Sequence, residues 1–228
     1  MTDILASTVF ANARGGNAAY ATARSTSNAQ DTSTSYLYLG QYHPSDYFVN
    51  RFFIRFDTSG IAAGTLSSLK IRLTARIDSS TTDFDIQVVK YDWSAWAADL
   101  ANATKRETAY DGCLAGAADD NIWRSTSGMS LDTPYESGEL DPAWINRSGY
   151  TYYGFRSSRD FGNNTPTNDE LIAIRMATDT TSAWRPYLVY TLIPSSIKKV
   201  AGVSLASIKK ANSVAIGSIK KVAGVSNQ

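Results

Sequence analysis

The feature that most constrains the fold is a strict alternation of apolar and polar residues. Apolar side chains occupy every odd position from Leu69 to Ala75, and polar side chains occupy every even position from Lys70 to Arg76. Successive side chains of a β-strand point to opposite faces of a sheet, so a period of two predicts a strand that is buried on one face only. The segment therefore belongs to a sheet that packs against a core.

Alternating, aromatic or β-branched segments recur along much of the chain. They predict strands over residues 35–42, 47–56, 65–78, 84–93, 149–158, 170–178 and 184–193. Residues 1–35 predict a short strand followed by a long loop, and residues 94–149 are irregular, with one short helix near Asp141–Asn146. About eight short strands separated by polar turns favour a sandwich or a barrel, so the expected fold class is all-β.

Beyond Pro194 the sequence repeats itself with a period of 11 residues. The three copies, which start at Ser196, read SIKKVAGVSLA, SIKKANSVAIG and SIKKVAGVSNQ. We expect a β domain over residues 1–194 and a repeat tail over residues 195–228. An 11-residue period suits a helix in a right-handed supercoil. The glycines, serines and valines of the tail are poor helix formers, so we prefer strands, with one strand and one turn in each repeat.

Charge divides the chain at the same place. The tail carries six lysines and no acid or arginine, whereas the rest has 16 basic and 21 acidic residues. The tail therefore has a net charge of +6 and the rest a net charge of −5. Such asymmetry indicates an interaction segment, although lysines also keep an apolar repeat soluble. One thin repeat cannot bury its own apolar face, so we expect contacts with other subunits. The candidate contact residues are Ile197, Lys198, Lys199, Val203, Ile208, Lys209, Lys210, Ile219, Lys220 and Lys221.

Four segments of the first 194 residues, in the same order, resemble DNRLRE-type domains. They are VNRFFIRFDTSGIAAGTLSSLKIRL, YDWSAW, GYTYYGF and RPYLVYTL, which are Val49–Leu73, Tyr91–Trp96, Gly149–Phe155 and Arg185–Leu192. The resemblance implies a jelly-roll β-sandwich akin to carbohydrate-binding modules. It also implies a place on secreted, cell-surface or virion proteins without enzymatic activity.

The tail resembles Ile-Lys-Lys-Val-x-Gly-Val repeats at the ends of bacteriophage and environmental structural proteins. The start, MTDILASTVFANARGG, lacks the basic and apolar regions of a signal peptide. We therefore expect a virion, or an extracellular location reached by assembly or lysis. A membrane partner is not expected, because no 18-residue apolar run exists. Specific nucleic-acid binding is not expected either, because the tail has no arginine or aromatic residue.

Catalytic and metal chemistry finds little support in the sequence. The single cysteine, Cys113, excludes an internal disulfide, and the single histidine, His43, lies in an HPSD segment that reads as a turn. No cofactor is expected. A structural calcium ion remains open, because loop oxygens suffice for it. The weak candidate ligands are Asp119, Asp120 and Asp160, with Asn121, Asn163 and Asn164 beside them.

Exposed tryptophans are the candidates for glycan binding, because an apolar sugar face packs on an aromatic ring. Trp93 and Trp184 lie in strand patterns and are expected in the core, whereas Trp123 and Trp144 lie in the irregular segment and are the better candidates.

Three hypotheses follow for the function of the whole chain. It is a structural subunit of a virion or filament that assembles through its tail, a carbohydrate-binding module on a surface, or an enzyme. The first is preferred and the last is remote.

Overall fold

The computed structural model describes residues 2–30 and 36–194, together with six pairs in the tail: 199–200, 203–204, 210–211, 214–215, 221–222 and 225–226. Twelve strands form one antiparallel sheet with the path β1-β12-β6-β11-β4-β5-β10-β7-β8, and β2, β3 and β9 pair beside it. The all-β fold class is confirmed. The strands are β1 (Thr2–Leu5), β2 (Ala11–Asn17), β3 (Ala29–Gln30), β4 (Tyr36–Tyr42), β5 (Tyr47–Asp57), β6 (Gly64–Asp78), β7 (Asp85–Lys90), β8 (Ala118–Ser125), β9 (Pro134–Glu136), β10 (Tyr150–Ser157), β11 (Glu170–Arg175) and β12 (Tyr187–Pro194).

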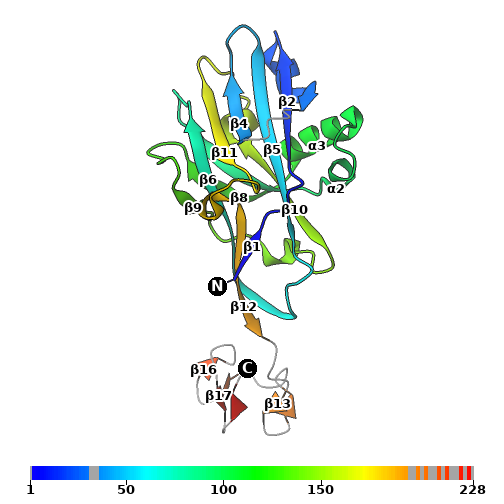
Figure 1. The fold of residues 1–228 in the computed structure, drawn as a ribbon, viewed down its shortest axis with the longest axis vertical. Coiled ribbons are helices and arrows are strands. Elements are labelled where there is room, and N and C mark those ends of the chain that lie inside the picture. The colour runs from blue at the N-terminus through cyan, green and yellow to red at the C-terminus, as the bar shows by residue number, and fades with distance from the viewer. Residues whose placement is uncertain are drawn as a thin grey trace.

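The sheet forks at β5, which gives the fold its layered, sandwich-like form. Along one edge, β5 pairs with β2 over residues 47–53. Along the other edge it pairs first with β4, over residues 48–50, and then with β10, over residues 52–57. Strands β4 and β10 therefore lead into different parts of the sheet. Figure 1 shows β6, β11, β4, β5 and β2 side by side in one view.

The main core lies between these parts, as the alternation in β6 predicts. Leu69, Ile71 and Leu73 are fully buried. They join side chains from β4, β5, β7, β10, β11 and β12 in one apolar cluster. Within it the rings of Phe52 and Phe155 stack with centroids 4.2 Å apart. The jelly-roll order of strands that the family resemblance implies stays a prediction.

Short helices form a second layer on the outer face of β5. Phe53 points away from the main core, and its ring centroid lies 5.4 Å from that of Trp96. Figure 1 places α2 and α3 beside β5 and β10. The helices are α1 (Tyr20–Ser25), α2 (Ser94–Ala97), α3 (Ala103–Ala115) and α4 (Ser158–Phe161), with 3-10 turns η1 (Pro142–Trp144) and η2 (Ser182–Trp184). Among the residues described, no helix is long and apolar enough to cross a membrane.

The helices were only partly predicted. The short helix expected near residue 143 is present as η1. The loop expected after the first strand instead contains α1, and the irregular segment contains the 13-residue helix α3. Helix α3 buries only Ala109, Tyr110 and Cys113. Because these three residues form only a narrow apolar stripe among charged residues, the sequence shows no clear helical periodicity in this segment.

In the tail, the described residues form three antiparallel pairs of short strands rather than helices, so the preference for strands is confirmed there. Each repeat, however, holds two paired strands instead of the one expected. The two strands of a repeat are separated by two residues in the sequence. The strands are β13 (Lys199–Val200) with β14 (Val203–Ser204), β15 (Lys210–Ala211) with β16 (Val214–Ala215), and β17 (Lys221–Val222) with β18 (Val225–Ser226).

Candidate ligand-binding site

A cavity of about 440 Å³ opens on the sheet where β2, β5, β4 and β11 lie side by side. Cavities that bind small molecules typically measure roughly 300–1,000 Å³. Two aromatic rings, a cation, an anion, an amide and a hydroxyl meet here. The lining residues are Arg14, Tyr38, Tyr42, Asn50, Ser79, Asp169 and Leu171.

Strand register explains why these side chains meet. Arg14 pairs with Asn50, Asn50 with Gly40, and Gly40 with Leu171, so one row crosses four strands. Residues directly opposite one another in antiparallel strands share a face of the sheet. The side chains of Arg14, Asn50 and Leu171 therefore stand on one face, with Gly40 between the last two.

The backbone at Gly40 strongly favours glycine. Gly40 has φ = 111°, a conformation that residues with a side chain rarely adopt. A Cβ atom built there would lie 1.9 Å from the carbonyl oxygen of Glu170. Close packing of β4 against β11 thus requires glycine at this position, next to the cavity.

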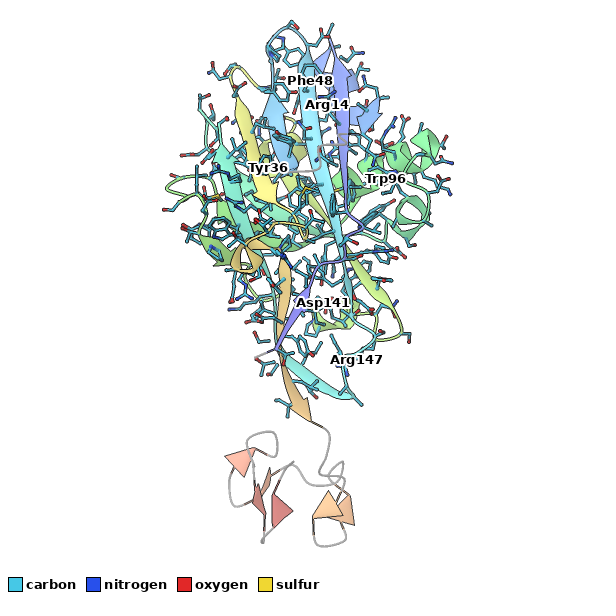
Figure 2. All side chains as sticks on the ribbon, in the orientation of Figure 1. Arg14, Tyr36, Phe48, Trp96, Asp141 and Arg147 are labelled. Carbon is cyan, nitrogen blue, oxygen red and sulfur yellow. The ribbon has the colours of Figure 1, made fainter. Side chains whose placement is uncertain are left out.

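A stack of planar groups fixes the position of Arg14. The rings of Tyr42 and Phe48, which are cross-strand partners, stack with centroids 4.9 Å apart and an interplanar angle of 21°. The Arg14 guanidinium carbon lies 5.2 Å from the centroid of Phe48. Figure 2 shows Arg14 and Phe48 next to each other at the end of the sheet that lies away from Arg147. The guanidinium is held beside the cavity without an ion pair in the described residues.

Two buried hydrogen-bond donors beside the cavity have no acceptor among the described residues. Asn50 is 2% exposed, and neither its amide nitrogen Nδ2 nor the buried Nε of Arg14 has a hydrogen-bond partner. Most buried polar groups in proteins are hydrogen-bonded, and an unsatisfied one costs about 1–3 kcal/mol. Arg14 and Asn50 are cross-strand neighbours. Both donor atoms are buried, so a ligand in the cavity would reach them only if the side chains moved.

On the opposite face of the same strands, a buried hydrogen-bond chain holds β4 and β11 together. The Tyr20 hydroxyl donates to Oε1 of Gln41 at 2.8 Å, and Nε2 of Gln41 donates to Oε2 of Glu170 at 2.6 Å. Arg159 forms an ion pair with Glu170 at 2.7 Å. Burial, and then the charge of Asp160, raise the pKa of Tyr20, so its hydroxyl stays a neutral donor.

Arg51, the neighbour of Asn50, anchors β5 on that opposite face. Its guanidinium binds both carboxylate oxygens of Asp160, at 2.7 and 2.9 Å, and donates to the carbonyl oxygens of Tyr110 and Arg24. Burial by itself would lower the pKa of Arg51, but Asp160 and Tyr110 hold it above the usual value. The strands below the cavity are therefore tied to α1, α3 and α4.

The structure does not bring the two candidate tryptophans to this cavity. Trp123 is 3% exposed, and its Nε1 donates to the carbonyl oxygen of Ile71 at 3.1 Å. Its expected place at the surface is wrong, because the irregular segment supplies strand β8, whose Trp123 points into the core. Trp144 is half-buried in η1 and donates to the carbonyl oxygen of Tyr152 at 2.8 Å. Trp93 is buried, as expected, whereas Trp184 is half-buried.

The candidate calcium ligands are each engaged in their own hydrogen bonds within the protein. Asp119 accepts from the backbone N–H of Asp141 at 2.9 Å, and Asp120 accepts from that of Gly138 at 2.6 Å. Both oxygens of Asp160 face Arg51. Within the described part of the chain, no three His, Cys, Asp or Glu side chains gather in a way that could hold a metal ion.

The remaining candidates lie elsewhere. The ring of His43 stacks on Tyr47 with centroids 3.9 Å apart, in the connection between β4 and β5. Of the tail candidates, only Lys199, Val203, Lys210 and Lys221 fall on described residues, where they belong to the small strands. The candidates outside the described residues are Ile197, Lys198, Ile208, Lys209, Ile219 and Lys220.

Sequence reasoning missed every residue of the cavity, although two signals were present. Gly40 interrupts a strand pattern, which usually marks a bulge or a close backbone approach. Asn50 is an uncharged polar residue in the middle of the apolar run YFVNRFFIRF. The tyrosines of β4 add a third hint, since Tyr38 and Tyr42 share one face of the strand.

Comparisons with protein-family models and with curated proteins found no match for this chain. The resemblance to DNRLRE-type domains therefore remains a prediction from four short segments. Function has to be inferred from the cavity and from the tail.

Proposed function

We propose that this chain is a non-enzymatic binding module that holds a sugar ring of a glycan in the cavity beside Gly40. The observation that carries the proposal is the mixed lining of the cavity, in which two tyrosines stand beside Arg14 and Asp169. A sugar ring has an apolar face, which packs on aromatic rings, and hydroxyl groups, which pair with amide, guanidinium and carboxylate groups. Those are the groups that line this cavity.

The lining also argues against catalysis on the glycan. Glycoside hydrolysis typically needs two carboxyl groups, one on each side of the scissile bond. Among the described residues, Asp169 is the only carboxylate that lines the cavity. A binding role is therefore the simpler assignment.

The proposal is tested by glycan-array screening of the whole chain, followed by calorimetry on the best ligand. Replacing Tyr42 by Ala removes one aromatic wall and should weaken binding about tenfold, which corresponds to about 1.4 kcal/mol. Tyr36→Ala is the matched control, because Tyr36 lies in the same strand but outside the cavity lining. A wild-type chain that binds no glycan, or a Tyr42→Ala variant that binds as tightly as wild type, would refute the proposal.

The tail supports a second proposal, that the chain is a structural subunit of a virion or an extracellular filament and forms homo-oligomers. Its described strands pair only within each repeat, and none of them pairs with the main sheet. An isolated two-stranded hairpin is marginally stable at best in water. The described strands of each pair have one edge without further pairing among the described residues, which another chain could extend by strand addition. The two proposals are compatible, because the cavity and the tail are separate in the chain.

A further inference from the structure

We infer that a pocket between α2 and α3 is the docking site for a Ser-Ile-Lys-Lys segment from the tail of a second copy of this chain. The inference rests on the second proposed function, assembly through the tail, and names the surface that receives the tail. Three observations carry it: the size and lining of the pocket, the carboxylates at its rim, and the part of the repeat that is identical in all three copies.

The pocket has the size and surface to hold one aliphatic side chain. Its volume is about 180 Å³, below the roughly 300–1,000 Å³ of cavities that bind small molecules. Its most deeply buried lining residues are Trp93 and Trp96, each 1% exposed, with ring centroids 6.1 Å apart. Figure 2 shows Trp96 beside the two helices.

The two indole N–H groups are already hydrogen-bonded within the protein. Nε1 of Trp93 donates to the carbonyl oxygen of Ile54 at 3.3 Å, and Nε1 of Trp96 donates to that of Leu100 at 3.0 Å. The tryptophans therefore offer ring surface rather than free donors to the pocket. An aliphatic side chain needs only such a surface, because it gains free energy simply by leaving water.

The side walls of the pocket are fixed by contacts within the protein. The Tyr91 ring packs so closely on Gly112 of α3 that a Cβ atom there would lie 2.1 Å from it, and its hydroxyl donates to the carbonyl oxygen of Thr108 at 3.1 Å. Lys105, a cation of the lining, is paired with Asp99 at 3.2 Å. The pocket is thus formed before a partner binds, which lowers the entropic cost of binding.

Two carboxylates lie near the rim of the pocket. Asp92 is part of the lining and accepts a hydrogen bond from the backbone N–H of Ser94 at 2.8 Å. Burial, followed by the nearby Cys113, Asp92 and Asp111, raises the pKa of Tyr91, so both carboxylates are close to this wall. Neither of them forms an ion pair in the described part of the chain. The rim therefore favours a partner with positive charge next to its apolar group.

The repeat of the tail combines these two features in its identical part. Each copy opens with Ser-Ile-Lys-Lys, at residues 196–199, 207–210 and 218–221, whereas six of the seven positions that follow vary between copies. In an extended segment, side chains two residues apart point to the same side and lie about 6–7 Å from each other. The second lysine then stands beside the isoleucine, so the isoleucine enters the pocket and the lysine reaches the carboxylates.

The number of motifs favours a neighbouring chain as the donor. Each tail carries three Ser-Ile-Lys-Lys motifs, and a pocket of this size holds one isoleucine at a time. At least two motifs of every chain are therefore left for the pockets of other copies. Several weak contacts of this kind, linked in one tail, together give a stable assembly.

The test follows self-association of the full chain by analytical ultracentrifugation over a range of concentrations. Ala95 lines the pocket and is exposed, so Ala95→Trp should fill the pocket without disturbing the core. We expect the dissociation constant of the assembly to rise at least about tenfold, because the buried isoleucine is lost. In the matched control Ala143→Trp, an exposed alanine of the short turn η1 outside the lining is replaced, and association should be unchanged.

The tail supplies the complementary variant. Replacing Ile197, Ile208 and Ile219 by Ala should weaken association as much as filling the pocket does, and the two changes combined should add little, because both remove the same contact. Asp92→Asn keeps an acceptor for the Ser94 N–H but removes the charge, so association should become weaker and less sensitive to salt. Thermal unfolding of each variant establishes that it is folded.

The outcomes separate the inference from the proposed assembly. If truncation after Pro194 abolishes association but Ala95→Trp leaves it unchanged, the tail docks elsewhere, and the inference is wrong while the proposed assembly stands. Unchanged association of the triple isoleucine variant refutes the inference in the same way. A full chain that is monomeric at every concentration, or a truncated chain that stays oligomeric, refutes the proposed assembly through the tail and the inference with it.

Discussion

At the scale of single residues, the ion pair between Arg51 and Asp160 is the most deeply buried one among the described residues. Their side chains are 0% and 1% exposed, so both charges are removed from water. Removing a charge from water costs several kcal/mol, and only close, multiple hydrogen bonds repay that cost. Arg51 makes them to Asp160, Tyr110 and Arg24, and its guanidinium also lies 3.7 Å from the centroid of the Tyr110 ring. The pair fixes the strand that presents Asn50 to the cavity.

Breaking this pair should therefore destabilise the fold. Asp160→Asn keeps the shape of the side chain but leaves the Arg51 charge buried and unpaired, so we expect a loss of about 3–5 kcal/mol in the free energy of unfolding. Urea denaturation followed by circular dichroism measures it. The matched control is Asp3→Asn, which removes a partly exposed pair with Arg72 and should cost at most about 1 kcal/mol. Equal losses in the two variants would show that the buried ion pair stabilises the fold no more than the exposed pair does.

At the scale of secondary-structure elements, the strands that could be predicted are those with one or two apolar faces. The long strands β5 and β6 were found within a residue or two, because their buried positions alternate or run continuously in aromatic and β-branched residues. Strands β1 and β9 are only 4 and 3 residues long, too short for a period to emerge. The pairing that defines them comes from the rest of the sheet.

The cavity could not be predicted in the same way, because it depends on register between strands far apart in the sequence. Arg14, Asn50 and Leu171 are separated by 36 and 121 positions, yet the pairing puts them on one row. Nothing in the local sequence of Ala11–Asn17 or Glu170–Arg175 states which residues of β5 and β4 they will face. The sequence does mark the key position, Gly40, as an exception to its strand.

Gly40→Ala tests that position. The variant must place a Cβ atom at φ = 111° and 1.9 Å from the carbonyl oxygen of Glu170, so β4 and β11 must move apart. We expect a loss of more than about 2 kcal/mol in the free energy of unfolding, since the left-handed conformation alone costs roughly 1–2 kcal/mol. Chemical denaturation measures the loss. In the control Gly60→Ala, the new methyl group meets no atom within 4 Å, and an effect as large as that of Gly40→Ala would contradict the argument.

At the scale of the whole molecule, the chain divides by sequence, by charge and by pairing at nearly the same residue. The main sheet ends with β12 at Pro194. Beyond it lie the 11-residue repeats, with six lysines against the net −5 of the preceding residues. The described tail strands form separate two-residue pairs, so each repeat contributes few hydrogen bonds of its own. Isolated pairs of such short strands are marginally stable at best in water.

Partner chains would resolve this shortage, because repeats gain stability by packing on neighbours and a +6 tail is attracted to a −5 surface. Truncation after Pro194 should therefore convert an oligomer into a monomer in light scattering. The thermal midpoint of the truncated chain should stay close to that of the full-length chain measured as a monomer, since the described tail strands make no pairing with the main sheet. Replacing all six lysines by glutamine separates charge from strand pairing, because it removes the attraction and keeps the repeats. If the truncated chain remains oligomeric, subunit contacts belong to the main sheet, and its edge strands β1 and β8 become the place to look for them.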